Sequence, residues 1–202
     1  MIPRALIALF VLLAATDARA LILQLKTADI ERALALARWP TSDVERTRFH
    51  ARYQFPVNGR TVEFFAVQRV EVISEFRRLE LIAEEHARMN DLFGRGGLRD
   101  VEEALLPWRG LLTIVVHLKF DPTRYITGVP AVRFAMDGST MLLANDIKES
   151  GLYSSGDQPV LIGARIEAVF DARRVGQETR NLSVYRERNE IARVPIEFAN
   201  LE

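Results

Sequence analysis

The chain has 202 residues, 49% of them hydrophobic, and its 27 basic residues balance its 27 acidic ones. A neutral chain has no electrostatic footprint for nucleic acid or for an anionic membrane, so we expect neither as a partner. The sequence contains no cysteine, which excludes disulfides and thiol chemistry, and its apolar content is sufficient for one sizeable core.

Residues 1–20 have the three parts of a secretory signal. Arg4 supplies an early positive charge, residues 5–15 form an apolar run, and Ala18-Arg-Ala20 matches a small-x-small cleavage pattern. The apolar run is shorter than the roughly 18 residues that a membrane-spanning helix needs. We therefore expect cleavage after Ala20, no stable membrane anchor afterwards, and a single exported domain over residues 21–202.

The basic residues also indicate the source. Only three of the 27 are lysines, a bias typical of a GC-rich bacterial genome. The expected destination is therefore the bacterial periplasm or the extracellular space.

Helical patterns dominate residues 21–110. A first helix is expected from Ala28 to the residues before Pro40, because the residue before a proline disfavours the helical region. Ser42 has capping-box spacing to Glu45, which predicts one or two further turns.

The longest helix is expected from about Val70. Apolar residues recur there every three or four positions, with charged residues between them, which predicts an amphipathic helix of about twenty residues. The glycine-rich residues 94–97 should stop this helix, and Asp100 should cap a further short one.

A first hairpin is predicted around Asn58-Gly59, the dipeptide preferred in two-residue hairpin loops. Its strands would be residues 49–57 and 60–67. Apolar side chains then share one face, with Phe55 opposite Val62.

A strand over residues 111–120 is expected to join the helical part to a β-rich part, residues 111–202. Alternate positions from Leu112 to Phe120 are apolar, which is the pattern of a half-buried strand. Further along, residues 160–170 alternate in the same way, and the Ser- and Gly-rich residues 148–159 are expected to form a loop.

Two more hairpins are predicted in the β-rich part. In the first, a turn at Asp137-Gly138 sets Phe134 opposite Met141. In the second, a three-residue loop at residues 187–189 sets Val184 opposite Ala192 and places Asn189 in the left-handed conformation.

These elements predict an α+β fold that is mainly antiparallel β. About eight strands form a sandwich-like or partly closed sheet. A long amphipathic helix and two or three short helices pack on it.

The sequence assigns no catalytic, cofactor-binding or metal-ligating residue, and we expect no cofactor. His50, His86 and His117 lie in no ligand motif. His86 is expected to be a hydrogen-bonded core residue, and the other two are expected on the outer faces of strands. A three-histidine metal site would require all three to converge in space.

Other chemistry-bearing residues are also expected to be structural. Ser154-Ser155 lacks the G-x-S-x-G elbow of a nucleophile, and Gly94-Arg-Gly-Gly97 follows a helix where a phosphate loop follows a strand. The remaining candidates are loop acids that could bind calcium or form half of a carboxylate pair, and an arginine pair that could bind an anion; solvation is the default for all of them. They are Asp146, Glu149, Asp157 and Arg173-Arg174.

Three functions remain open. The preferred one is a non-catalytic binding or accessory module that contacts another periplasmic or cell-surface protein, and a broad exposed apolar patch would favour it. The second is a carrier of an apolar small molecule in a β-lined cavity. The third is a hydrolase whose residues converge only in space, which a cleft with His50 or His117 beside an acid would favour.

Overall fold

A computed structural model of the chain describes residues 21, 24–37, 42–57, 61–91, 93–94, 97–137 and 141–201. The predicted signal, the expected helix end at Pro40 and the Asn58-Gly59 loop lie outside the described residues. Across the described ranges, no helix is long and apolar enough to cross a membrane.

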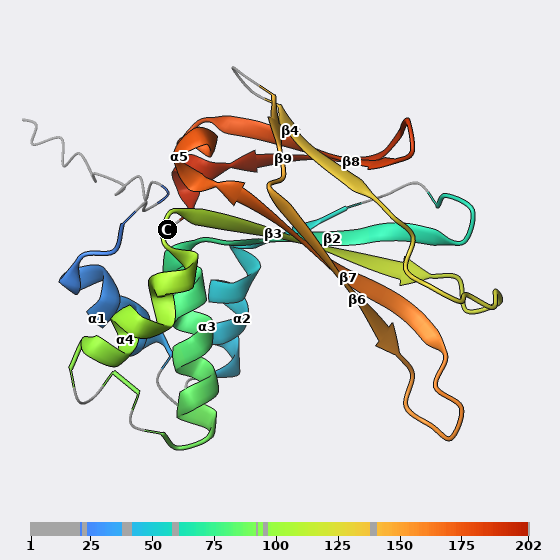
Figure 1. The fold of residues 1–202 in the computed structure, drawn as a ribbon. Helices are drawn as coiled ribbons and strands as arrows, with labels where there is room; N and C mark the ends of the chain where they lie inside the picture. Colours follow the sequence, from blue (N-terminus) through green and yellow to red (C-terminus); the bar gives the residue numbers. More distant parts are fainter. Residues whose placement is uncertain are drawn as a thin grey trace, which may run out of the picture.

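The described part of the chain has an α+β, mainly antiparallel fold, as predicted. Nine strands form two open sheets, with the orders β1-β2-β3-β7-β6 and β5-β4-β8-β9. Helices α1 to α4 gather on one side of the five-stranded sheet, and the four-stranded sheet covers the other side (Figure 1). The strands are β1 (Gln54–Pro56), β2 (Phe65–Ile73), β3 (Leu111–Phe120), β4 (Arg133–Asp137), β5 (Leu142–Leu143), β6 (Asp146–Tyr153), β7 (Leu161–Asp171), β8 (Thr179–Arg186) and β9 (Asn189–Glu197). The helices are α1 (Thr27–Leu36), α2 (Asp43–Ala51), α3 (Glu75–Arg88), α4 (Arg99–Leu105) and α5 (Ala172–Val175).

The predicted strand over residues 111–120 is β3, the middle strand of the five-stranded sheet. Leu112, Ile114 and Val116 are buried toward the four-stranded sheet. Thr113 and Val115 are buried too, because helices cover the opposite face. The strand therefore lies between the two other layers.

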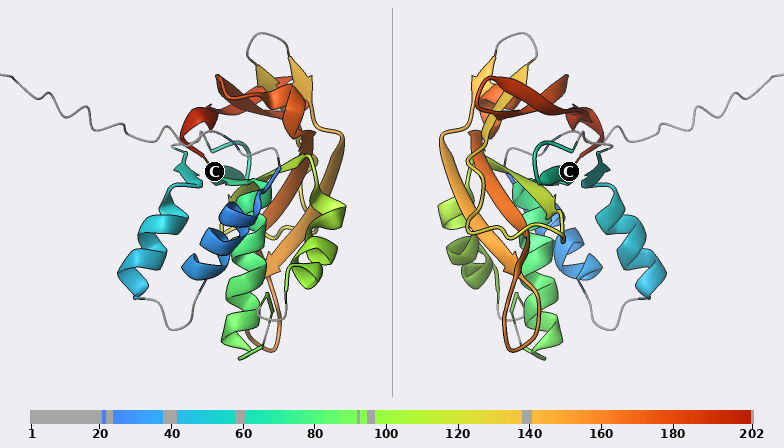
Figure 2. Two further views of the ribbon diagram at one scale, coloured as in Figure 1. Left: turned by 90° about the vertical axis from the view of Figure 1, so that its left-hand side faces the viewer. Right: turned by 90° about the vertical axis from the view of Figure 1, so that its right-hand side faces the viewer.

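Two separate groups of buried apolar residues form the core. The larger one fills the space between the sheets and includes Phe134, Met136 and Leu182. The smaller one lies within the helical layer and includes Phe76 and Leu79 of α3. Figure 2 shows these layers from the two sides.

The predicted register of the first hairpin is wrong. Phe55 pairs with Val70 instead of Val62. Val62 forms a bridge with Phe65 around a tight turn in which Glu63 has a φ of 55°. Strands β1 and β2 still pair antiparallel, but the connection between them is longer than a two-residue loop.

Helix α2 takes residues that the sequence pattern assigned to the first strand. Ser42 caps it, and its Oγ accepts a hydrogen bond from the Glu45 N–H at 3.3 Å, as the capping-box spacing predicted. The helix then continues to Ala51, because Phe49 packs against both core groups from a helical position. His50 consequently lies on a helix and not on a strand.

Helix α3 is shorter than predicted. It begins at Glu75, after Ser74, whose Oγ accepts a hydrogen bond from the Arg77 N–H at 3.2 Å. Residues 70–73 belong instead to β2, where they pair with β3. The following helix, α4, has Leu98 rather than Asp100 as its N-cap.

The hairpin β4–β5 forms with a different register from the predicted one. Met136 pairs with Leu142, so Phe134 does not face Met141. The turn residue Gly138 lies outside the described residues.

The hairpin β8–β9 has the predicted pairing of Val184 with Ala192. An irregularity after Val184 brings Arg186 opposite Asn189, so the loop is shorter than expected. The residue with positive φ is Glu187, at 55°, and not Asn189.

The loop expected over residues 148–159 is only partly a loop. Residues 148–153 belong to β6, which pairs with β7 along its whole length. Backbone pairing with β7 therefore overrides the loop composition of this segment.

Candidate functional site

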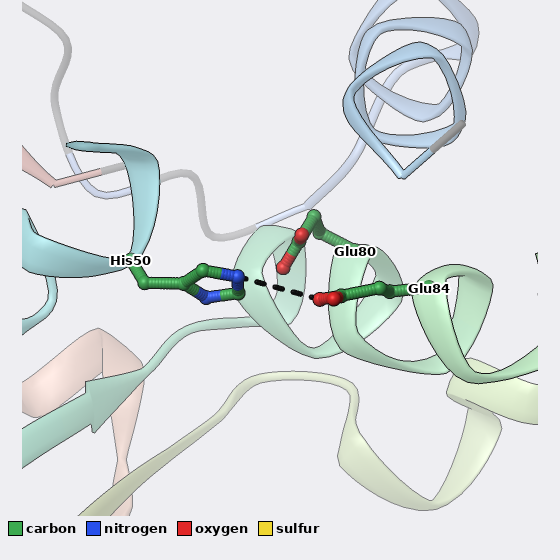
Figure 3. Close-up of side chains that lie close together, drawn as sticks. All are labelled: His50, Glu80 and Glu84. Atoms are coloured by element: carbon green, nitrogen blue, oxygen red, sulfur yellow. Dashed lines mark ion pairs between the residues drawn. The ribbon is translucent and has the colours of Figure 1, made fainter. Parts of the chain in front are cut away.

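Acidic and basic side chains of the helical layer converge on one cluster against the five-stranded sheet. His50, Glu80 and Glu84 lie at its centre. Each offers one ligand atom, and these atoms lie within 4.8 Å of one another. Figure 3 shows the three side chains turned toward a common point from α2 and α3.

Two helices position these side chains. Glu80 and Glu84 are four residues apart on α3, so they share one face of that helix. Residues of α2 and β2 face this side of α3, and Glu80 is only 2% exposed. His50 lies in the last turn of α2, with its Nε2 3.4 Å from Glu84 Oε2.

Arg77 supplies the positive charge at the inner end of the cluster. This buried guanidinium binds Glu80 and lies 3.4 Å from Glu71 Oε1 on β2. It also lies over the rings of Phe49 and Tyr53, at 5.4 and 5.3 Å from their centroids. One guanidinium therefore compensates two carboxylates and fills the space between α2, α3 and the sheet.

The network continues in two directions from this centre. Glu84 Oε1 accepts a hydrogen bond from Arg88 at 2.6 Å and lies 3.5 Å from Arg46 Nη1. On the sheet side, His117 Nε2 of β3 lies 3.7 Å from Glu71 Oε2. Two of the three histidines thus face carboxylates, where the sequence placed them on the outer faces of strands.

The same burial shifts the cluster's carboxyl groups in opposite directions. Burial and the Glu84 charge raise the pKa of Glu80 to about 7, against the attraction of Arg77. Burial also disfavours the charged form of Glu71, but its contacts with the β3 histidine and Arg77 outweigh burial and lower its pKa. Burial and the Arg77 charge lower the pKa of His50, so its imidazole is neutral at pH 7.

This cluster has to be interpreted from its own geometry. No protein-family model, curated protein or solved structure matches the chain. The arrangement has the donor types of a metal site and a carboxyl that exchanges its proton near neutrality.

His86 belongs to a second polar group at the end of α3. Its Nδ1 lies 2.8 Å from Asp91 Oδ2, and its ring stacks on Phe93 with a centroid distance of 4.5 Å. These residues line a hollow of about 930 Å³ between α1 and α3, together with Leu34 and Ala83. His86 is hydrogen-bonded as predicted, but it lies at this surface hollow and not in the core.

A group of exposed apolar side chains lies at the end of the β6–β7 hairpin. Leu152 and Tyr153 of β6, with Val160 and Ile162 of the β7 arm, are each 41% to 63% exposed. Strand β6 is the outermost strand of the five-stranded sheet, and it is exposed along nearly its whole length (Figure 1). We call these four side chains and the free backbone edge of β6 the β6 edge.

The candidates named from the sequence lie away from the cluster. Asp146 and Glu149 are exposed residues of β6, Asp157 lies in the β6–β7 loop, and Arg173-Arg174 belongs to α5. Ser154 Oγ accepts a hydrogen bond from the Val160 N–H at 3.0 Å, which is a structural role.

Glu80 is the central residue that the sequence did not reveal. Its only local signal is the four-residue spacing to Glu84 on the side of α3 that carries most of the charges, and that side was expected to face solvent.

Proposed function

We propose that the protein is an exported, non-catalytic binding module that contacts another protein of the bacterial envelope through the β6 edge. The occupant of this edge is an extended segment of the partner, which adds to the five-stranded sheet as a further strand. The observation that supports the proposal is the exposure of β6, an eight-residue edge strand.

The other edges of the two sheets are short or carry a proline. Strand β1 has three residues and ends in Pro56, strand β5 has two residues, and β9 carries Pro195. A short strand or a proline protects an edge against pairing with another chain. Strand β6 has neither, so it is the edge best suited to accept a strand.

The side chains of β6 suit a selective contact. Lys148 and Glu149 alternate between the two faces of the sheet, and Leu152 and Tyr153 add exposed apolar surface at the end. In strand addition, backbone hydrogen bonds supply affinity and alternate side chains supply specificity. A central lysine also discourages unselective pairing.

The carrier hypothesis has less support. The hollow of about 930 Å³ is lined by helices, and its walls combine Leu34 and Phe93 with Glu31 and Arg88. The space between the sheets contains the main group of buried side chains. A β-lined apolar cavity is therefore not the feature that these residues provide.

Site-specific photocrosslinking in the native cell envelope tests the proposal. A photoreactive residue at Lys148 or Leu152 should crosslink to one protein, whereas the same residue at Arg99, an exposed position of α4, should not. The proposal is wrong if the β6 positions crosslink no more than Arg99, or if the captured protein is a second copy of this chain.

A matched pair of variants separates the β6 edge from general hydrophobicity. Leu152→Lys with Tyr153→Lys should abolish the crosslink from Lys148. Met89→Lys with Leu106→Lys should preserve it, because these residues are 63% and 64% exposed but lie in the helical layer. Equal loss in both variants would contradict a contact at β6.

A further inference from the structure

The donor atoms of His50, Glu80 and Glu84 already have spacings close to those of a metal site. Two ligands of one tetrahedral zinc ion lie about 3.4 Å apart, given metal–ligand distances of about 2.1 Å. His50 Nε2 and Glu84 Oε2 are 3.4 Å apart, and the ligand atom of Glu80 lies within 4.8 Å of both. A small rotation of the Glu80 side chain would complete a three-residue set.

The surrounding guanidinium groups orient the carboxylates for this role. Arg88 holds Glu84 Oε1, which leaves Oε2 directed at His50. Arg77 binds one oxygen of Glu80. Groups that hydrogen-bond the outer atoms of ligands fix their orientation in metal sites, and these arginines stand in the positions of such groups.

Helix α2 offers a route of entry to this enclosed position. It has no buried residue, whereas α3 is buried along one side. Movement of α2 away from α3 would therefore expose the three donors with little loss of apolar packing. Closure of α2 over an ion would link the two helices through His50.

We propose that His50, Glu80 and Glu84 bind a divalent transition-metal ion of the zinc type, which fastens α2 to α3. One imidazole nitrogen and two carboxylate oxygens suit zinc, whereas calcium and magnesium prefer sites made of oxygen alone. The fourth position is left for water. This inference is independent of the β6 edge, which lies on another part of the five-stranded sheet.

Calorimetric titration of the chelator-treated, purified protein with zinc chloride tests the inference. We expect one equivalent to bind and to raise the thermal unfolding temperature. His50→Ala and Glu84→Gln should each weaken binding by at least about tenfold. Glu80→Gln, which is nearly isosteric, should do the same, and circular dichroism should confirm that each variant is folded.

His86→Ala is the matched control, because His86 also pairs with a carboxylate at the end of α3. It should bind zinc as the unsubstituted protein does. The inference is overturned if the unsubstituted protein binds no zinc, if His50→Ala binds it undiminished, if His86→Ala alone loses it, or if calcium binds more tightly than zinc.

Discussion

At the scale of single residues, the buried charges of the helical layer depend on Arg77. Its guanidinium contacts Glu80 and Glu71 and lies over two aromatic rings. Arg77→Met keeps much of the side-chain volume but leaves two buried carboxylates without their cation. We expect the free energy of unfolding to fall by about 3–5 kcal/mol, as measured by urea denaturation.

Arg99→Met is the control for this substitution. Arg99 pairs with Glu103 on an exposed surface, so its loss should change the free energy of unfolding by less than about 0.5 kcal/mol. If Arg77→Met were as stable as Arg99→Met, the cluster would not depend on this guanidinium.

Glu80 predicts a pH dependence of stability in metal-free buffer. Its pKa is about 7 in the folded protein, against an ordinary value of 4.5, so the folded state favours the protonated carboxyl. The stabilisation is complete below about pH 4.5 and is lost as the pH rises through 7. The charged groups that face it from the neighbouring elements are Arg77, Glu84, Arg88, His50, Arg46, Glu71 and His117.

Glu80→Gln isolates this effect, because the glutamine stays neutral at every pH. Between pH 5 and pH 8, the unsubstituted protein should lose stability relative to Glu80→Gln by on the order of 3 kcal/mol. His50 titrates in this range with the opposite sign, but it is present in both proteins. Parallel stability curves, from urea denaturation at each pH, would refute the raised pKa.

At the scale of elements, the pairing of β3 with β7 depends on a glycine. A Cβ atom at position 163 would lie 2.5 Å from the Leu118 carbonyl oxygen, which is backbone and cannot rotate away. Gly163→Ala should therefore force the two strands apart and lower the free energy of unfolding by about 1–3 kcal/mol. Gly128→Ala, which meets no atom within 4 Å, should have little effect in the same chemical denaturation. Equal stability of the two variants would contradict this close approach.

The sequence predicts elements best where local pattern and tertiary packing agree. Alternation identifies β3, and the apolar pairing of Val184 with Ala192 identifies the β8–β9 register, because burial on one face specifies both. The first hairpin is mispredicted because Phe49 is buried from a helix, which no local pattern indicates. Strand β6 is missed because its pairing with β7 outweighs a loop-like composition.

At the scale of the whole molecule, the candidate metal site depends on packing between elements. Glu80 and Glu84 lie on the side of α3 that a hydrophobic pattern assigns to solvent, and α2 and β2 face that side in the structure. His50 reaches them only because residues near Phe49 are helical. Sequence periodicity gives the side of a helix on which a charge lies, but it cannot show that another layer covers that side.

The two separate core groups predict that the helical layer opens independently of the sheets. Phe76 and Leu79 pack within the helices, whereas Met136 packs between the sheets. Native-state hydrogen exchange should therefore give a lower opening free energy for the amides of α1 and α4 than for those of β3 and β7. Equal values for the helices and the strands would show a single cooperative unit.

Substitutions in the two core groups make this prediction sharper. Met136→Ala should lower the opening free energy of β3 and β7 amides by about 2–5 kcal/mol and leave that of α1 amides unchanged, because the sheets stay intact when only the helices open. Leu79→Ala should lower both values, because it destabilises the native state from which each opening starts. If Met136→Ala lowered the α1 value as much as the β7 value, the helical layer would open only with the sheets, and α2 could not expose the three metal donors by a local movement.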